Sequence, residues 1–416
     1  MKNSIRWRKD MAKFGFIGFG HRGINMLECL LDHIDGYEIV AICDLMEERV
    51  EEAKSHFEKR GLKVPFATTS EDEFFNVEMD GMFIMAYWEA HIPLAIRAMK
   101  KGIIPGLEVG GAYTVEDCFE LVKTYEETGI HTMLLENCCY GKTELTVLKM
   151  VREGLFGDVV HCSGGYHHDL RKEISYGVQK KHYRLRNYIS RNCENYPTHE
   201  LGPIAKILNI NRGNRMLQLS SFASKTKGLH KYINDHIEDL SHLKNTEFNQ
   251  GDIVTTVITC ANGETIVLTL DTTLPRAYSR GFTVRGTNGS YFEENDSVFF
   301  DTEEDNKFHF DWYKHFRNGE KMREEHLHPL WKKYGAAADG TGHDGIDYLI
   351  LKAYIETVEK KAIPPIDTYD TASWMAITPL SEQSIKMGGA PVAIPDFTKG
   401  KWAMPREKSE LEFALD

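Results

Sequence analysis

The pattern of hydrophobic and polar residues changes in character near residue 140. Before that point, short apolar runs typical of buried strands alternate with longer amphipathic stretches typical of helices. The predicted strands cover 13–20, 37–44, 80–86, 103–109 and 131–137, and the predicted helices run through 29–31 and over 46–60, 91–102 and 115–129. Strands that alternate with helices of this length indicate βαβ units around a parallel sheet. We therefore predict a Rossmann-type dinucleotide-binding domain of α/β class over residues 1–140.

The rest of the chain has a different pattern. A predicted helix at 143–154 is followed by predicted strands at 158–169, 253–260, 264–273, 282–287 and 290–295. Several of these runs alternate with a period of two, and Asn-Gly pairs at 262–263 and 288–289 favour tight hairpin turns. We expect a second, α+β domain over 141–390 with a mostly antiparallel or mixed sheet, one face of which is covered by helices at 199–209 and 345–361. An extended tail is expected over 391–416.

Composition and charge narrow the range of partners. The chain has 416 residues, of which 42% are hydrophobic and 27% charged, as in ordinary globular proteins. Its net charge of −12 argues against a nucleic-acid or anionic membrane partner, and no apolar run approaches the roughly 20 residues of a membrane span. The basic start of the chain is not followed by a signal-peptide core, so a cytoplasmic protein is expected, or an exported one if the N-terminus has been trimmed. The eight cysteines show no C-x-x-C spacing, which favours reduced thiols and no metal site.

Three glycines after the first predicted strand have the spacing of a dinucleotide-binding loop. Gly18 permits a tight turn, Gly20 lets the backbone approach a pyrophosphate, and Gly23 lets the following helix pack closely on the strand. Asp44 closes the second strand, where a carboxylate accepts the ribose hydroxyls of NAD and disfavours the extra phosphate of NADP. The alternative is an ordinary glycine turn with Asp44 capping a helix.

YPTHELGPI (196–204) contains the best catalytic candidate. Thr198 is expected to cap a helix, which places His199 at the helix N-terminus. There the helix dipole favours the neutral imidazole, suited to a base near neutral pH. A histidine used only for capping or packing is the alternative.

GGYHHD (164–169) lies on a predicted strand, so Tyr166 and His168 share one face, while His167 and Asp169 share the other. A metal site built from His161, His167, His168 and Asp169 is disfavoured because this alternation divides the ligands. For Tyr166 the alternative to a catalytic role is an ordinary sheet aromatic.

Four further polar residues admit two interpretations each. Arg184 and Tyr278 are expected on loops, where they bind a hydroxylated ligand or remain solvated on the surface. GTGHDGIDYL (340–349) opens a helix with Asp344 and Asp347, which either line a site or cap the helix.

Several motifs resemble known families. GFIGFGHRG, AICD, WEAH, LEV, LEN and GHDGID are similar to the glucose–fructose oxidoreductase and inositol dehydrogenase (Gfo/Idh/MocA) superfamily, which pairs a Rossmann domain with an open-faced sheet domain. Longer blocks, among them MLLENCCYG, GGYHHDLR, RNCENYPTHELGPI and NGETIVLTLDTT, resemble the NAD-dependent α-N-acetylgalactosaminidases of glycoside hydrolase family 109. The similar blocks run from about residue 12 to residue 402.

The resemblance implies two sets of binding residues. The NAD contacts it implies, beyond the glycine loop, are His21, Arg22, Asp44, Trp88, His91, Glu108, Val109 and Asn137. The sugar contacts it implies are Tyr166, Arg184, Tyr196, Pro197, Thr198, His199 and Tyr278. Where the superfamily's dehydrogenases usually carry Glu-Lys-Pro, this chain has Glu108-Val109-Gly110 and so lacks the lysine that assists hydride transfer.

The resemblance also implies a mechanism. NAD oxidises C3 of a terminal N-acetylgalactosamine, the C2 proton is lost, the C1 oxygen is expelled, water adds, and C3 is reduced again. His199 is then the acid/base at the C3 hydroxyl and Tyr166 the base at C2, which requires the site to lower the pKa of Tyr166. The alternatives are an NAD-dependent sugar dehydrogenase and a non-enzymatic sensor that keeps NAD. A homodimer through the open sheet face is also expected.

Overall fold

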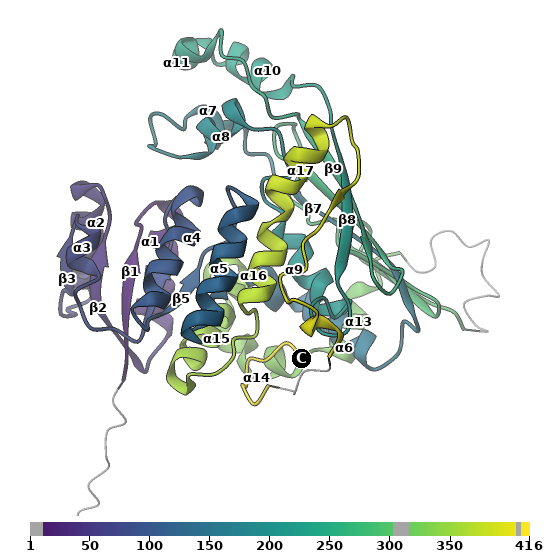
Figure 1. The fold of residues 1–416 in the computed structure, drawn as a ribbon, viewed down its shortest axis with the longest axis horizontal. Helices are drawn as coiled ribbons and strands as arrows, with labels where there is room; N and C mark the ends of the chain where they lie inside the picture. Colours follow the sequence, from purple (N-terminus) through teal and green to yellow (C-terminus); the bar gives the residue numbers. More distant parts are fainter. Residues whose placement is uncertain (1–10, 303–315, 405–408) are drawn as a thin grey trace, which may run out of the picture.

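Two β-sheets, each with its own helices, make up the fold in the computed structural model, which describes residues 11–302, 316–404 and 409–416 (Figure 1). The basic start of the chain, on which the expected localisation rests, lies outside the described residues. Residues 405–408 of the expected tail also lie outside them.

The first sheet has six parallel strands in the order β3-β2-β1-β4-β5-β6, as predicted for a Rossmann domain. Its strands are β1 (Ala12–Ile17), β2 (Tyr37–Cys43), β3 (Phe66–Thr68), β4 (Gly81–Ile84), β5 (Ile104–Leu107) and β6 (Met133–Leu134). Its helices are α1 (His21–His33), α2 (Glu47–Lys59), α3 (Glu71–Phe74), α4 (Trp88–Lys100) and α5 (Val115–Thr128). The sixth strand is shorter than predicted, because the Glu136 carboxylate accepts the Cys138 N–H and starts the 3₁₀ helix η1 (Asn137–Tyr140).

The second sheet has eight strands in the order β13-β12-β11-β7-β10-β9-β8-β14 and is mixed, as expected. Only β7 and β10 pair in parallel, and the other described pairs are antiparallel. The strands are β7 (Val159–His167), β8 (Met216–Ala223), β9 (Ile253–Cys260), β10 (Thr265–Asp271), β11 (Thr283–Gly286), β12 (Gly289–Phe292), β13 (Ser297–Phe300) and β14 (Val392–Ala393). The sequence pattern missed β8, whose register shifts between Met216 and Gln218 and interrupts the alternation of buried residues. It also missed the short strands β3, β13 and β14.

The described α-helices after residue 140 pack on the second sheet and on the first domain. They are α6 (Lys142–Arg152), α7 (Arg171–Ser175), α8 (Arg184–Ser190), α9 (Thr198–Ile207), α10 (Gly228–Asp235), α11 (Ile237–Leu240), α13 (Gly319–His326), α14 (Pro329–Ala338), α15 (Ile346–Lys360), α16 (Thr368–Met375) and α17 (Ile377–Lys386). Helix α9 packs on β7 as predicted, and α17 packs on β8. Figure 1 shows α16 and α17 between the two sheets.

The predicted position of α15 is wrong. It packs against β1 and α1 of the first domain instead of covering the second sheet. Its Tyr354 hydroxyl accepts the Met82 N–H (2.9 Å) and donates to the Ile104 carbonyl (2.6 Å). The ring has room there because Gly81 and Gly106 carry no side chain: a Cβ on either would lie 2.8 Å from Tyr354. Hydrophobic periodicity predicts that a helix has a buried face, but it does not say which sheet buries it.

The second sheet leaves one face open. Alternate residues of β9 and β10 on this face are exposed or half-buried, and Val257 and Phe222 are exposed. All eight cysteines lie in the described residues, and all are buried and unbridged. No helix in the described ranges is long and apolar enough to cross a membrane.

Candidate functional site

The glycine loop connects β1 to α1 at the carboxyl edge of the first sheet. Gly18 has φ +97, and a Cβ there would lie 2.6 Å from the Met85 carbonyl. A Cβ on Gly23 would lie 2.0 Å from the Gly18 oxygen, so this glycine is required by the contact between helix and strand. A Cβ on Gly20, by contrast, would have free space, because the nearest atom, on the Arg49 side chain, would be 3.9 Å away. The loop is therefore open only at Gly20, the position predicted to face a pyrophosphate.

Asp44 ties this loop to the second strand. Its buried carboxylate accepts the backbone N–H of Phe19 (2.7 Å) and of Met46 (3.0 Å). The bond to Met46 fixes the turn before α2, and the bond to Phe19 places the carboxylate at the glycine loop. Asp44 therefore does not cap α2, whose cap position is Met46, and its contact with ribose stays a prediction that its place at the glycine loop supports.

Asp347 joins three of the predicted cofactor residues. Its carboxylate accepts hydrogen bonds from both terminal nitrogens of Arg22 (2.6 and 2.8 Å) and from Nδ2 of Asn137 (2.7 Å). Arg22 is in turn connected to Glu108, because its Nε lies 3.3 Å from the Glu108 carboxylate. Burial alone raises the pKa of Asp347, but Arg22 and His343 outweigh it and hold this pKa below its usual value. Asp347 therefore lies among the predicted cofactor residues and does not cap α15, whose cap position is Gly345. It is the carboxylate that connects Arg22 with Asn137.

Three buried polar atoms among the predicted cofactor residues have no hydrogen-bond partner in the described part of the chain. They are Trp88 Nε1, His91 Nδ1 and Glu108 Oε2. The other ring nitrogen of His91 bonds to the Ala86 carbonyl (2.9 Å), and burial lowers the pKa of His91 to about 4, so the ring is neutral. Because buried polar atoms normally have partners, these three atoms and the open glycine loop fit a bound dinucleotide. His21 is exposed at the first position of α1, beside Gly20.

The backbone excludes a Glu-Lys-Pro segment at residues 108–110. Gly110 has φ +139, which proline cannot adopt, and a Cβ there would lie 2.4 Å from Trp88 Nε1. Val109 packs in a buried cluster with Tyr166 and Tyr196. An apolar side chain thus occupies the place of the dehydrogenases' lysine.

The sugar-side residues form an aromatic cluster. The ring of Tyr166 lies 4.3 Å from that of Tyr196 and 5.5 Å from that of His199, and the rings of Tyr196 and His199 are 4.9 Å apart. Trp88, 5.9 Å from Tyr196, connects this cluster to the cofactor set. The structure therefore brings the two predicted sets of residues together.

Arg184 and Tyr278 border the cluster. Arg184 begins α8 instead of lying on a loop; it is buried, with its guanidinium 5.0 Å from the Tyr196 ring and 2.8 Å from Glu173. Burial opposes its charge, but Glu173 and the surrounding phenols raise the pKa of Arg184 well above its usual value. Tyr278 lies on a loop, as predicted, 51% exposed and 5.2 Å from the His168 ring.

His199 is held by a carboxylate that the sequence patterns did not single out. Its Nδ1 lies 2.7 Å from Oε1 of the buried Glu136, which leaves Nε2 as the nitrogen able to exchange a proton with a ligand. Burial raises the pKa of Glu136, but His199, Thr198 and the Cys138 N–H together lower it by more, so this pKa lies below its usual value and the carboxylate is charged. The only sequence signal for it is its position beside Asn137 at the end of a strand.

Two predictions about this region are wrong. Pro197, not Thr198, occupies the cap position of α9, and no described side chain caps this helix end, since the chain enters it already in helical conformation. The site also does not lower the pKa of Tyr166: burial raises it, and the Arg184 cation opposes this only in part. The phenol therefore retains its proton, and its oxygen lies within hydrogen-bond distance of His168 Nδ1 (3.1 Å).

One group of described residues has the spacing of metal ligands: Glu136, Cys138 and His199. Burial raises the pKa of the Cys138 thiol, and the Arg280 guanidinium lies 3.5 Å from its sulfur. A cation at this point would be repelled by Arg280, so the group does not support a metal site.

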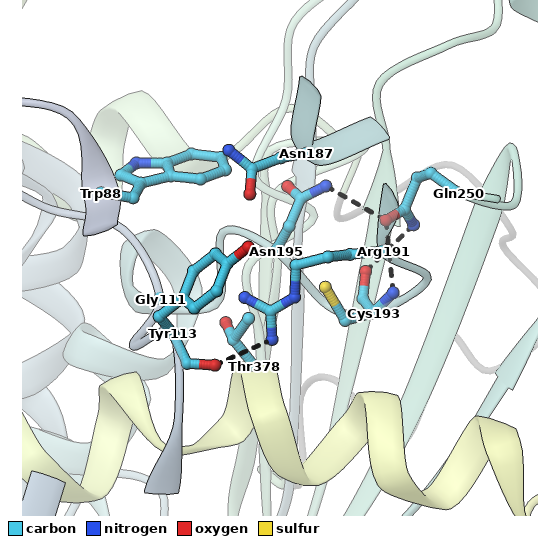
Figure 2. A pocket seen from close by; sticks show the side chains of 9 residues that line it. All are labelled: Trp88, Gly111, Tyr113, Asn187, Arg191, Cys193, Asn195, Gln250 and Thr378. Atoms are coloured by element: carbon cyan, nitrogen blue, oxygen red, sulfur yellow. Dashed lines mark hydrogen bonds between the residues drawn. The ribbon is translucent and has the colours of Figure 1, made fainter. Parts of the chain in front are cut away.

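A narrow recess lies behind Trp88, between the two domains, and holds little more than one water molecule (Figure 2). Asn195 and Gln250 form part of its wall and are bonded to each other (3.4 Å), and Arg191 closes it by bonding the Tyr113 carbonyl. Of the predicted site residues only Trp88 lines it, so this recess supports the indole and is not the sugar site.

Residues 171–190, here called the strap, extend from the second domain over the first (Figure 1). Arg186 forms a two-point ion pair with Glu89 on α4 (2.8 and 2.9 Å), and Lys181 pairs with Glu48 on α2. Arg49 bonds the Lys181 carbonyl (3.3 Å) and lies 3.8 Å from Asp44. The strap therefore contacts the same arginine that lies nearest to the open side of Gly20.

The fold and the site together define a two-domain protein with a Rossmann domain and a mixed-sheet domain that carries an aromatic cluster beside the predicted cofactor residues. Levoglucosan dehydrogenase in complex with NADH and L-sorbose has this fold, with a TM-score of 0.68 at 16% identity, covering 93% of this chain and 100% of that one. So does myo-inositol 2-dehydrogenase from Lactobacillus plantarum, with a TM-score of 0.63 at 15% identity, covering 92% of this chain and 100% of that one.

The sequence defines the family more closely. Residues 140–404 match the model of the glycosyl hydrolase 109 C-terminal domain. The chain is 40% identical over 421 residues to an α-N-acetylgalactosaminidase of Tannerella forsythia, covering 94% of this chain and 87% of that protein. It is 35% identical to an α-N-acetylgalactosaminidase of Shewanella oneidensis, covering 95% and 87%. The chain belongs to glycoside hydrolase family 109.

Proposed function

We propose that this protein hydrolyses terminal α-N-acetylgalactosaminides and retains NAD as a catalyst that is restored in each turnover. The observation that carries this proposal is the position of the His199–Glu136 pair and Tyr166 beside the cofactor residues with unpaired polar atoms. Family membership and the names of the relatives support the hydrolytic activity. The Asp44 carboxylate favours NAD over NADP.

In each step of the proposed hydrolysis, particular residues of this chain bind or move a proton. The dinucleotide supplies an acceptor for the C3 hydride. His199 Nε2 takes the C3 hydroxyl proton, while Glu136 holds the ring and stabilises the imidazolium. Loss of the C2 proton toward Tyr166 leaves its electron pair to form the C1–C2 double bond as the C1–oxygen bond breaks. Water then gives its hydroxyl to C1, and the proton it loses balances the one taken up by the expelled oxygen. Tyr166 returns a proton to C2, and His199 Nε2 returns its proton to the C3 oxygen, where a bound dinucleotide would supply the hydride.

A sugar dehydrogenase is the competing function, since the solved structures of the same fold are oxidoreductases. The backbone at Gly110 and the apolar Val109 disfavour it, because they leave no place for the lysine that the superfamily's dehydrogenases usually carry. A sensor that keeps NAD without turnover is also disfavoured, because sensing does not require the His199–Glu136 pair.

The decisive experiment follows the C2 proton. Purified protein is incubated in D₂O with a chromogenic α-N-acetylgalactosaminide and no added cofactor, and the product is examined by NMR. We expect hydrolysis with deuterium at C2, together with NAD released on heating the protein. Activity with a fully protonated C2 and no isotope effect for C2-deuterated substrate excludes the redox mechanism. Accumulation of reduced nicotinamide with free sugar and added NAD identifies a dehydrogenase.

The acid/base assignment is tested by substitution. His199→Ala and Tyr166→Phe are each expected to lower kcat by about 10²–10⁴, the usual effect of losing a general acid or base. NAD content should remain near that of the wild type in both variants, as should the Tm of Tyr166→Phe, whereas His199→Ala leaves the buried Glu136 without its imidazole partner and should lower Tm. Near-normal kcat in both variants refutes the assignment.

A second copy of this chain is the proposed occupant of the open sheet face. Val257 and Phe222 expose apolar surface on it. Val257→Lys is expected to shift the mass measured by light scattering from dimer to monomer, whereas Leu62→Lys, an exposed apolar position outside both sheets, should not. A wild-type monomer disproves this proposal.

A further inference from the structure

Tyr166 and His168 form a hydrogen-bonded pair on one face of β7. They are two residues apart, so they point to the same side of the sheet, and the phenol oxygen lies 3.1 Å from His168 Nδ1. The His168 backbone is fixed by its N–H bond to the Asp271 carbonyl (3.0 Å), and its ring stands edge-on to Tyr278. Both ends of the hydrogen bond are therefore held in place.

The surroundings of Tyr166 and His168 set the pKa of each group and so determine their charges. Burial raises the pKa of Tyr166, while burial and the Arg184 cation lower the pKa of His168. At neutral pH both groups are therefore uncharged, and in the tautomer that carries the imidazole proton on Nε2 the phenol donates to His168 Nδ1.

The groups around His168 come from every neighbouring segment. Arg184 of α8 and His199 of α9 oppose a charge on the ring, and Glu173 of α7 and the adjacent Asp169 favour it. A positive charge on His168 can therefore form transiently, balanced by two carboxylates, but is not the resting state.

A protonated phenol cannot by itself remove a proton from carbon. A tyrosine whose pKa is raised has almost no phenolate near neutral pH, yet the proposed function needs a base at C2. The contact with His168 supplies the missing acceptor.

We propose that His168 is the positioning residue that makes Tyr166 a base, by accepting the phenol proton while the phenol oxygen takes the C2 proton of the sugar. The inference rests on the proposed function. In this step the C2–H bond breaks and its electron pair stays on the sugar, an O–H bond forms on Tyr166, and the original O–H proton moves to His168 Nδ1. The same two transfers in reverse return a proton to C2 after water has added.

The test compares His168→Gln with His168→Ala. Glutamine can still accept a hydrogen bond from the phenol but cannot take its proton. A merely structural role predicts that glutamine restores activity; the proposed transfer predicts that kcat and C2 deuterium exchange fall by about 10²–10⁴ in both variants. Oxidation at C3 does not need His168, so mixing His168→Gln with substrate should produce the absorbance of reduced nicotinamide without release of the aglycone.

The pH profile gives an independent measurement. Wild-type kcat should fall at acidic pH as His168 becomes protonated, and this acidic decline should be absent from the low residual activity of His168→Gln. His167→Gln, on the opposite face of the same strand, is the control and should retain exchange and the acidic decline. If His168→Gln exchanges C2 at the wild-type rate, the inference is wrong. If the wild type neither exchanges C2 nor shows an isotope effect with C2-deuterated substrate, the proposed function itself fails.

Discussion

Glu136 is the residue on which the orientation of His199 depends. It is fully buried, and its carboxylate bonds both the imidazole and the backbone of η1. A charge-assisted bond of this kind contributes about 1.5–3 kcal/mol, so losing it affects both the site and the fold.

Glu136→Gln is therefore expected to lower kcat by about 10- to 100-fold, the equivalent of about 1.5–3 kcal/mol, with little change in KM. The exposed Glu126→Gln serves as the control, and equal kcat values for both variants would contradict the role assigned to Glu136.

The stability of the same variant should depend on pH. The pKa of Glu136 is lowered on folding, so its stabilisation is complete above the unfolded value of about 4.3 and is lost as pH falls through the folded value. The difference in free energy of unfolding between wild type and Glu136→Gln should thus be largest near neutral pH and shrink in acid. Urea unfolding at a series of pH values measures it, and a difference that grows in acid would show that the carboxylate is protonated in the fold.

At the scale of single elements, two glycines of the same loop serve different purposes: Gly23 is required by the packing of the fold, and Gly20 by the predicted ligand. Gly20→Ala has room for its Cβ and a φ of −65, so we expect an unchanged Tm but a large loss of bound NAD. Gly23→Ala drives its Cβ into the Gly18 carbonyl and should destabilise the protein by about 1–3 kcal/mol or more. Thermal unfolding and NAD content distinguish the two, and normal NAD content in Gly20→Ala would show that the loop does not face the pyrophosphate.

At the scale of the whole molecule, the strap connects the sheet domain to the edge of the cofactor loop. Exposed ion pairs contribute only about 0.2–1 kcal/mol each, so Lys181→Ala combined with Arg186→Ala should speed NAD dissociation by about 2- to 20-fold, with little change in Tm. The effect should diminish in high salt. Lys180→Ala, at the neighbouring exposed position, is the control, and an unchanged dissociation rate in the double variant would mean that the strap does not retain NAD.

The sequence by itself determined the two sheets and the glycine loop, and it singled out Tyr166 and His199 as candidates, because these depend on local signals. Alternation, periodicity and glycine spacing act over a few residues, and Tyr166 and His168 share a face simply because a strand has a period of two. Family resemblance supplied the remaining contacts residue by residue.

Only the tertiary structure decided which sheet buries α15, that Glu136 holds His199, and that Arg184 lies between three aromatic rings. It also decided the protonation of Tyr166, where the sequence-based prediction was wrong. The physical reason is the same in each case. Burial and charge are set by neighbours distant in sequence, and a pKa follows from that environment, which no local pattern of residues records.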